Sequence, residues 1–505
     1  MPSLPKPKNA IVILLDSLNR HMIGDYGGNE FDTPNIDRFA QRAVRFNRHF
    51  IGSFPCMPAR HDLLCGALDF LWKPWGSIEL WERPITAHLR EAGVNTMLFT
   101  DHPHLFETGG ENYHTDFFAW EYLRGHENDP WKSRPDPSWI GAPALPAGSR
   151  EWHYDRSRTY FREELDFPGP KTMHATANWI DLNSDFHDRF LLYVDEFDPH
   201  EPFDSPTPWM DRYDPTWEGP RIIWPPYGVR NIERGVITER EGSHIRCNYG
   251  SKLSMIDHWF GKVLDALDRS DLWRDTIVIL CTDHGHYLGE KDIWGKPQVP
   301  QYEPLGHTPL YIAYPGVESK HIDALTTNVD INATLCDVFD IEPDHHTHGV
   351  SLVPLLTGDA EHVREWAIGG VFGNWVMVYD GHRKYARAPV DNGFPLSMWS
   401  NRWSTMLYAG IHRLWPKPDM RATLDYMPGS DVPVIRQPFQ EGDLLPYWCA
   451  RPRVNEHHLY NIDLDPAEDE NRLGAGDEKD MIELLHEGLN AVEAPHEQFD
   501  RLGIA

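Results

Sequence analysis

Short apolar runs separated by helix-like patterns recur along the chain up to residue 281. Four of them are continuous enough to be strands buried on both faces: 10–15 (AIVILL), 94–99 (VNTMLF), 190–194 (FLLYV) and 276–281 (TIVILC). Apolar residues at helical spacing lie between them, most clearly over 253–267. Strands that alternate with helices predict βαβ units, and therefore an α/β fold with a mostly parallel sheet flanked by helices.

The pattern changes after about residue 370. The segments 375–379 (WVMVY) and 384–387 predict hairpin strands, and 480–492 predicts a terminal amphipathic helix. We therefore expect a catalytic domain over residues 1–370 and a smaller C-terminal α+β subdomain over 371–505, with a small antiparallel sheet. The Trp- and Pro-rich stretch 125–230 lacks clear periodicity and predicts long loops over the mouth of a site.

Charge and cysteine content narrow the classes of partner. The formal net charge of −30 argues against nucleic acid and anionic membranes, whose charge the protein would repel. The apolar run 10–15 is too short for a signal peptide or a membrane span. Six cysteines in 505 residues do not suggest a disulfide framework. We expect a cytoplasmic protein with reduced thiols, as a monomer or a homo-oligomer, whose small anionic substrate needs local positive charge.

Polar residues follow each of the four predicted strands. They are Asp16, the segment 100–104 (TDHPH), the segment 195–200 (DEFDPH), and the segment 282–284 (TDH). Ligands bind at the carboxyl ends of the strands in sheets of this kind. Every one of these strand exits carries a carboxylate, so together they predict one functional site.

The most specific motif is Cys56-Met57-Pro58-Ala59-Arg60, followed by 63–66 (LLCG). Proline is favoured in the first turn of a helix, so Cys56 is predicted at a helix N-terminus, where backbone N–H groups favour anions. The motif resembles the C-x-P-x-R signature of type I sulfatases. The resemblance extends over most of the chain, through 199–203 (PHEPF), 276–296 and 459–471 (LYNIDLDPAEDEN).

This resemblance implies an alkaline-phosphatase-like fold and the hydrolysis of a sulfate ester. It also implies that a formylglycine-generating maturase, or an equivalent enzyme, oxidises Cys56 to formylglycine. The hydrated aldehyde would attack sulfur and form a covalent hemiacetal-sulfate intermediate. An isolated cysteine before a helix is more often a buried structural residue. The accompanying Pro58, Arg60 and strand-exit residues favour the catalytic interpretation.

One divalent metal ion is expected at Asp16, Asp283, His284 and the modified Cys56. Oxygen ligands suit Ca²⁺, and the imidazole tilts the preference toward Mn²⁺. The family commonly carries two adjacent aspartates at the first position, but here the second is Ser17. That departure removes an anionic ligand and brings the sequence nearer to the related phosphonate monoester hydrolases.

The remaining catalytic candidates are cations and bases. By resemblance, His104 is the base that opens the intermediate, and His102 replaces a lysine beside the nucleophile. His200 and Lys296 are candidates to bind the ester oxygen and protonate the leaving group. Arg60 is expected to hold the nucleophile and the sulfuryl oxygens.

Two alternatives stay open at this stage. The same site could serve a phosphonate monoester hydrolase or phosphodiesterase, or the chain could be a catalytically inactive metal-binding scaffold with an unmodified Cys56. The alcohol part of the ester is equally open between sugar, aryl and alkyl groups. Three nearby histidines, His345, His346 and His348, suggest a metal site, but their polar surroundings favour a surface loop.

Overall fold

The computed structural model describes residues 4–136, 138, 153–403, 417–446, 449 and 456–505. Its centre is an eight-stranded sheet in the order β11-β2-β10-β7-β1-β5-β3-β4. In that order, the strands are Lys320–Thr327, Val44–Phe50, Leu310–Ala313, Thr276–Cys281, Asn9–Leu15, Phe190–Glu196, Asn95–Thr100 and Ala119–Tyr122. Only β10 pairs antiparallel to its neighbours, so the prediction of a mostly parallel sheet is confirmed.

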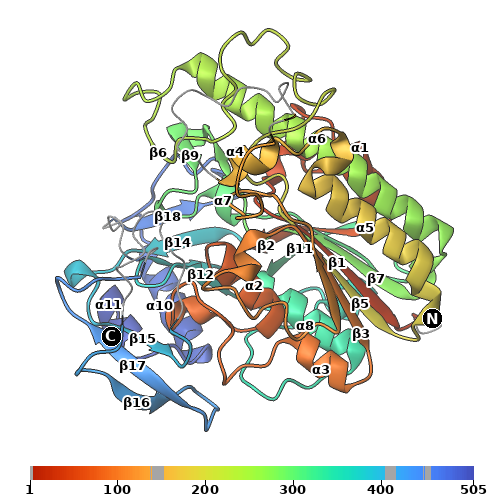
Figure 1. The fold of residues 1–505 in the computed structure, drawn as a ribbon. Helices are drawn as coiled ribbons and strands as arrows, with labels where there is room; N and C mark the ends of the chain where they lie inside the picture. Colours follow the sequence, from red (N-terminus) through yellow and green to blue (C-terminus); the bar gives the residue numbers. More distant parts are fainter. Residues whose placement is uncertain (1–3, 137, 139–152, 404–416, 447–448, 450–455) are drawn as a thin grey trace.

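Helices cover both faces of this sheet (Figure 1). On one face lie α2 (Cys56–Cys65), α3 (Ile85–Glu91) and α8 (Asn328–Phe339), and on the other lie α1 (Pro34–Ala40), α5 (Pro168–Asn183) and α6 (Glu239–Arg269). Successive side chains of a strand point to opposite faces. Accordingly Val12 and Leu14 of β1 belong to the first core, and Ile11 and Ile13 to the second. This explains why the run 10–15 is apolar without alternation.

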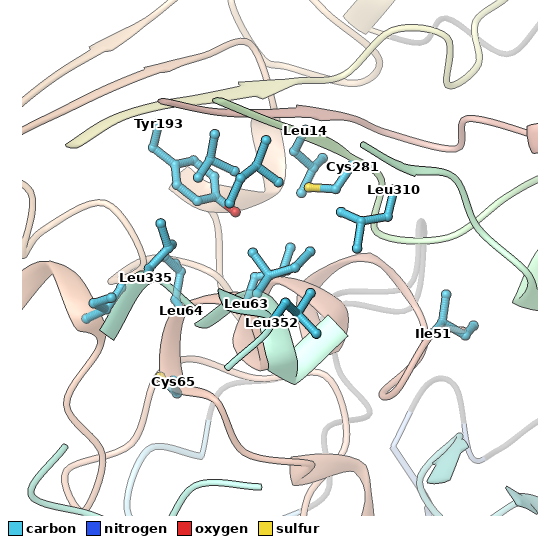
Figure 2. Packing of buried hydrophobic residues seen from close by; sticks show 14 of the residues in the cluster. Leu14, Ile51, Leu63, Leu64, Cys65, Tyr193, Cys281, Leu310, Leu335 and Leu352 are labelled. Carbon is cyan, nitrogen blue, oxygen red and sulfur yellow. The ribbon is translucent and has the colours of Figure 1, made fainter. Parts of the chain in front are cut away.

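The first core fixes the helix that carries the C-x-P-x-R motif. Leu63 and Leu64 of α2 pack with Leu335 of α8 beneath Leu14 and Tyr193 of the sheet, and all five are buried (Figure 2). The helix ends at Gly66, which adopts a left-handed conformation that glycine tolerates best.

The C-terminal part contains two further antiparallel sheets. One has the strands β12 (Ala367–Gly370), β13 (Val376–Tyr379), β14 (Arg383–Arg387) and β18 (His458–Asn461); the other has β15 (Leu396–Ser400), β17 (Pro433–Phe439) and β16 (Thr423–Tyr426). The predicted hairpin corresponds to β13 and β14. The predicted terminal helix corresponds to α10 (Glu478–Ala491), but a further helix, α11 (Glu497–Leu502), follows it. The proposed division at residue 370 stays a prediction.

Short elements complete the chain: α4 (His153–Arg158), α7 (Glu303–Gly306), α9 (Val353–Thr357), and a small sheet of β6 (Gly228–Val229), β9 (Ile293–Gly295) and β8 (Tyr287–Leu288). The stretch 125–230 is less irregular than predicted, because the helix α5 lies within it in addition to the predicted strand β5. Residues 137 and 139–152 of that stretch lie outside the described residues. No helix in the described part of the chain is long and apolar enough to cross a membrane.

A buried lysine, Lys73, stabilises the segment between α2 and α3. Its Nζ lies 3.1 Å from Asp69 Oδ2 and 3.7 Å from Glu82 Oε2. Replacing Lys73 by methionine would leave these two buried carboxylates with His61 alone, 3.0 and 2.7 Å away, and so with uncompensated negative charge. We expect the free energy of unfolding to fall by about 3–5 kcal/mol. Urea unfolding measures this free energy, and the exposed Lys262→Met variant is the control. Equal losses of stability in the two variants would contradict the stabilising role of Lys73.

Candidate active site

Four strand ends supply the side chains of the candidate site. The strands β7, β1, β5 and β3 are neighbours and run parallel, so their carboxyl ends meet at one edge. Asp16 follows β1, Asp195 lies near the end of β5, Asp283 follows β7 and His102 follows β3; all four are buried. The structure thus brings together residues from every strand exit that the sequence indicated.

Cys56 enters this site from the N-terminus of α2. It is the first helical residue, after Pro55 at the N-cap, and is 3% exposed. Its Sγ lies 3.2 Å from His284 Nε2 and 3.5 Å from Lys296 Nζ. A side chain in this position is close to the free backbone N–H groups of the first helical turn, which favour a negatively charged group.

Arg60 lies one turn further along α2 and connects three carboxylates. It donates two hydrogen bonds to Asp195, at 2.8 and 2.7 Å, one to Asp16 Oδ2 at 2.9 Å and one to Asp283 Oδ2 at 2.8 Å. The guanidinium geometry suits such simultaneous contacts. Asp195 was not among the predicted site residues; its place directly at a strand exit was the only signal in the sequence.

The four predicted metal ligands form one cluster. Donor atoms of Asp16, Cys56, Asp283 and His284 all lie within 4.8 Å of one another. His284 Nδ1 faces the Gly285 carbonyl oxygen at 2.9 Å, so the Nδ1–H donates there and the lone pair of Nε2 points toward Cys56. Burial lowers the pKa of His284 to about 3, which keeps the imidazole neutral. Two carboxylates and a neutral imidazole fit a divalent cation.

The unmodified thiol is poorly suited to be the nucleophile. Burial raises the pKa of Cys56 well above its usual value, and the nearby Lys296 only partly opposes this shift. The thiolate is the nucleophilic form of cysteine. At neutral pH, the Cys56 side chain therefore stays protonated.

Lys296 and His200 form a second pair beside Cys56. The Lys296 Nζ donates to His200 Nε2 at 2.7 Å, because the Nδ1–H of His200 already donates to the Glu201 carbonyl oxygen. Lys252 of α6 fixes the His200 backbone by donating to its carbonyl oxygen at 3.0 Å. Lys252 was missed by the sequence analysis, since a lysine on a long helix gives no signal of such a contact.

His102 and His104 differ in their protonation. Burial and the cation Arg60 lower the pKa of His102 well below its usual value, and neither of its ring nitrogens has a hydrogen-bond partner among the described residues. For His104, burial opposes protonation, but the carboxylates of Glu107 and Glu127 raise its pKa to about 10. His102 is therefore a neutral imidazole at pH 7, and His104 is a cation.

The charge of His104 makes stability depend on pH. The folded-state pKa of about 10 lies above the ordinary value of 6.5, so this stabilisation is complete below pH 6.5 and is lost as pH rises toward 10. In the Glu127→Gln variant, the drop in the urea midpoint between pH 6.5 and 10 should be smaller. The exposed Glu121→Gln should behave like the unchanged protein, and parallel curves for all three proteins would refute the assignment.

Comparisons with known proteins agree with this geometry. The Sulfatase family model matches residues 8–341. The choline-sulfatase of Rhizobium meliloti is 26% identical over 417 residues, covering 76% of this chain and 78% of the relative. The arylsulfatase K of Gallus gallus is 32% identical over 372 residues, covering 70% and 67%. The phosphonate monoester hydrolase of Agrobacterium radiobacter shares the fold, with a TM-score of 0.64, 18% identity and coverage of 97% and 95%.

Proposed function

This chain belongs to the sulfatase family of sulfuric ester hydrolases, and we propose that it uses formylglycine made from Cys56, together with one divalent cation, to hydrolyse a sulfate ester. The observation that carries the proposal is the position of Cys56. Its side chain lies at a helix N-terminus, in one cluster with Asp16, Asp283 and His284 and within reach of Lys296.

The cation would be held by Asp16, Asp283, His284 and the side chain of residue 56. When bound, it would supply positive charge that polarises the ester and lowers the pKa of an oxygen nucleophile. Once hydrated, formylglycine would supply that oxygen. The unmodified Cys56 side chain offers only a protonated thiol. Ca²⁺ and Mn²⁺ are both compatible with this set of oxygen and nitrogen donors.

The other residues position charge and protons around the sulfuryl group. Arg60 is already oriented by Asp195, and it would stabilise negative charge on the sulfuryl oxygens. Lys296 donates to Cys56 Sγ at 3.5 Å, a position that suits protonation of the leaving oxygen. His104 is the candidate for the base that opens the intermediate, and His102 lies beside it as a neutral imidazole.

A phosphonate monoester or phosphodiester is the second candidate substrate. Ser17 stands where a second acidic ligand is common in sulfatases, and its Oγ donates to Asp16 Oδ1 at 2.8 Å instead. The fold shared with a phosphonate monoester hydrolase is compatible with this candidate but does not favour it over a sulfate.

A panel of esters tests the proposal. The protein is coexpressed with a formylglycine-generating maturase and assayed on 4-nitrophenyl sulfate, choline sulfate and a phenyl phosphonate monoester. We expect higher kcat/KM for at least one sulfate than for the phosphonate. A consistent preference for the phosphonate would favour the second candidate. Mass spectrometry of the tryptic peptide 49–60 must show aldehyde in place of thiol at position 56.

Metal removal gives a further prediction. Dialysis against a chelator should abolish turnover, since the cation supplies part of the charge stabilisation in the transition state. Adding Ca²⁺ or Mn²⁺ should restore the rate in the unchanged protein but not in Asp283→Asn, which lacks one carboxylate of the cluster. Full activity of the metal-free protein, verified by elemental analysis, would contradict the proposal.

A further inference from the structure

A second group of metal-ligating side chains lies away from the active site, next to the C-terminal end of α2. It consists of His88 on α3 and of Asp344 and His345 in the loop between α8 and α9. His88 Nε2 lies 3.3 Å from Asp344 Oδ1, and His345 Nδ1 lies 3.8 Å from the same oxygen. All three donor atoms lie within 4.8 Å of one another.

Each of the two imidazoles presents toward the carboxylate a ring nitrogen that has no hydrogen-bond partner in the described part of the chain. His345 Nε2 lies 2.8 Å from the Cys65 carbonyl oxygen, so the Nε2–H donates there and leaves the lone pair on Nδ1. Neither His345 Nδ1 nor His88 Nε2 has a hydrogen-bond partner among the described residues, and both atoms are buried. The two side chains are only 8% and 10% exposed. Unpaired buried nitrogens of this kind are costly unless something binds them.

The carboxylate is also oriented for a ligand. Arg83 Nη1 donates to Asp344 Oδ2 at 2.7 Å, which leaves Oδ1 facing the two histidines. Metal ligands are typically held by such outer contacts: a carbonyl behind the histidine and a cation behind the carboxylate. Here the Cys65 carbonyl oxygen supports His345, and Arg83 supports Asp344.

We propose that His88, Asp344 and His345 form an accessory site for a divalent transition-metal ion of the zinc type. Two imidazole nitrogens and one carboxylate oxygen are a common zinc ligand set. Ligands about 2.1 Å from a tetrahedral ion lie roughly 3.4 Å apart, close to the distances of 3.3 and 3.8 Å from Asp344 Oδ1 to the two histidines. A cavity of about 230 Å³, lined in part by Arg83, Asp344 and His345, gives the fourth coordination position access to water or a small anion.

The bound ion joins two parts of the fold. It connects α3 to the loop between α8 and α9, and through the Cys65 carbonyl that loop already contacts the end of α2. The site is separate from the proposed chemistry, because α2 presents Cys56 at its other end. It therefore does not depend on the proposed function.

Cobalt binding tests the site in the full-length chain. The double variant Asp16→Asn, Asp283→Asn serves as the background, because it removes both carboxylates of the active-site cluster. After chelator treatment it should bind one Co²⁺ per chain, with the visible absorption of a four-coordinate ion. Adding His345→Gln or Asp344→Asn should weaken binding at least about tenfold, as loss of outer contacts alone typically weakens it by 10–100-fold.

His346→Gln is the matched control, since His346 lies in the same loop but pairs with Glu493 instead. It should leave Co²⁺ affinity unchanged. Three outcomes would overturn the proposal: no Co²⁺ bound to the background variant, equal binding with and without His345 and Asp344, or a thiolate-to-cobalt band, which would locate the ion at a cysteine such as Cys56 or Cys65. If His345→Gln does not fold by circular dichroism, Asp344→Asn decides, because the Asp344 side chain is 50% exposed.

Discussion

Replacing Cys56 by alanine is expected to lower kcat/KM for a sulfate ester by on the order of 10⁵-fold or more, as loss of a covalent nucleophile does in other hydrolases. The site would keep the cation ligands Asp16, Asp283 and His284, but it would lose the group that attacks sulfur. Initial rates of the matured protein and the variant on the same sulfate measure the effect.

Two controls make this result specific to position 56. The Cys247→Ala variant changes a partly buried cysteine of α6 and should keep full activity. Metal content of the Cys56→Ala variant should stay near that of the unchanged protein, because three of the four donors remain. Residual activity within tenfold of the unchanged protein would mean that another group attacks sulfur.

Replacing Lys296 by methionine should reduce kcat by an amount that depends on the leaving group. Lys296 Nζ lies 3.5 Å from Cys56 Sγ and 2.7 Å from His200 Nε2. Burial opposes its charge, but the carboxylates of Glu201, Asp16 and Asp283 raise the lysine pKa and keep it charged. Proton donation typically contributes about 10²–10⁴-fold. We expect about 10³-fold loss for an alkyl sulfate, whose leaving oxygen needs a proton.

An aryl sulfate with a stable phenolate leaving group should lose far less, on the order of tenfold. The ratio of the two losses separates proton donation from general charge stabilisation, which would affect both esters alike. Lys291→Met is the matched control, since Lys291 pairs with Asp469 at the surface and should leave both rates unchanged. Equal losses for alkyl and aryl esters would contradict the assignment of Lys296 as proton donor.

Strands buried on both faces were the most predictable part of the fold. The runs 10–15 and 276–281 match β1 and β7 within one residue, because a strand covered by helices must be apolar throughout. The strand β2 (VRFNRHF) was missed, since it alternates with polar side chains beside β10 and β11. The helix α5 was missed because two prolines and a glycine open it and its apolar pattern is weak.

The site residues that could be predicted are those that lie in one motif or directly after an apolar strand. Asp16, Asp283 and His284 follow apolar strands directly, and Cys56 and Arg60 share one motif. Contacts between distant segments could not be predicted from the sequence. For example, Arg60 pairs with Asp195, which lies 135 residues further along the chain. The loop of His345 was predicted to lie at the surface, yet the turn of the chain directs that side chain against Cys65.

The central claim is that residue 56 and a divalent cation share one site. Anomalous diffraction from crystals of matured protein soaked in Mn²⁺ tests it directly. We expect density for the ion at about 2.0–2.6 Å from oxygens of Asp16 and Asp283, from His284 Nε2 and from an oxygen on residue 56. An ion bound elsewhere only, or a residue 56 turned away from those carboxylates, would contradict it.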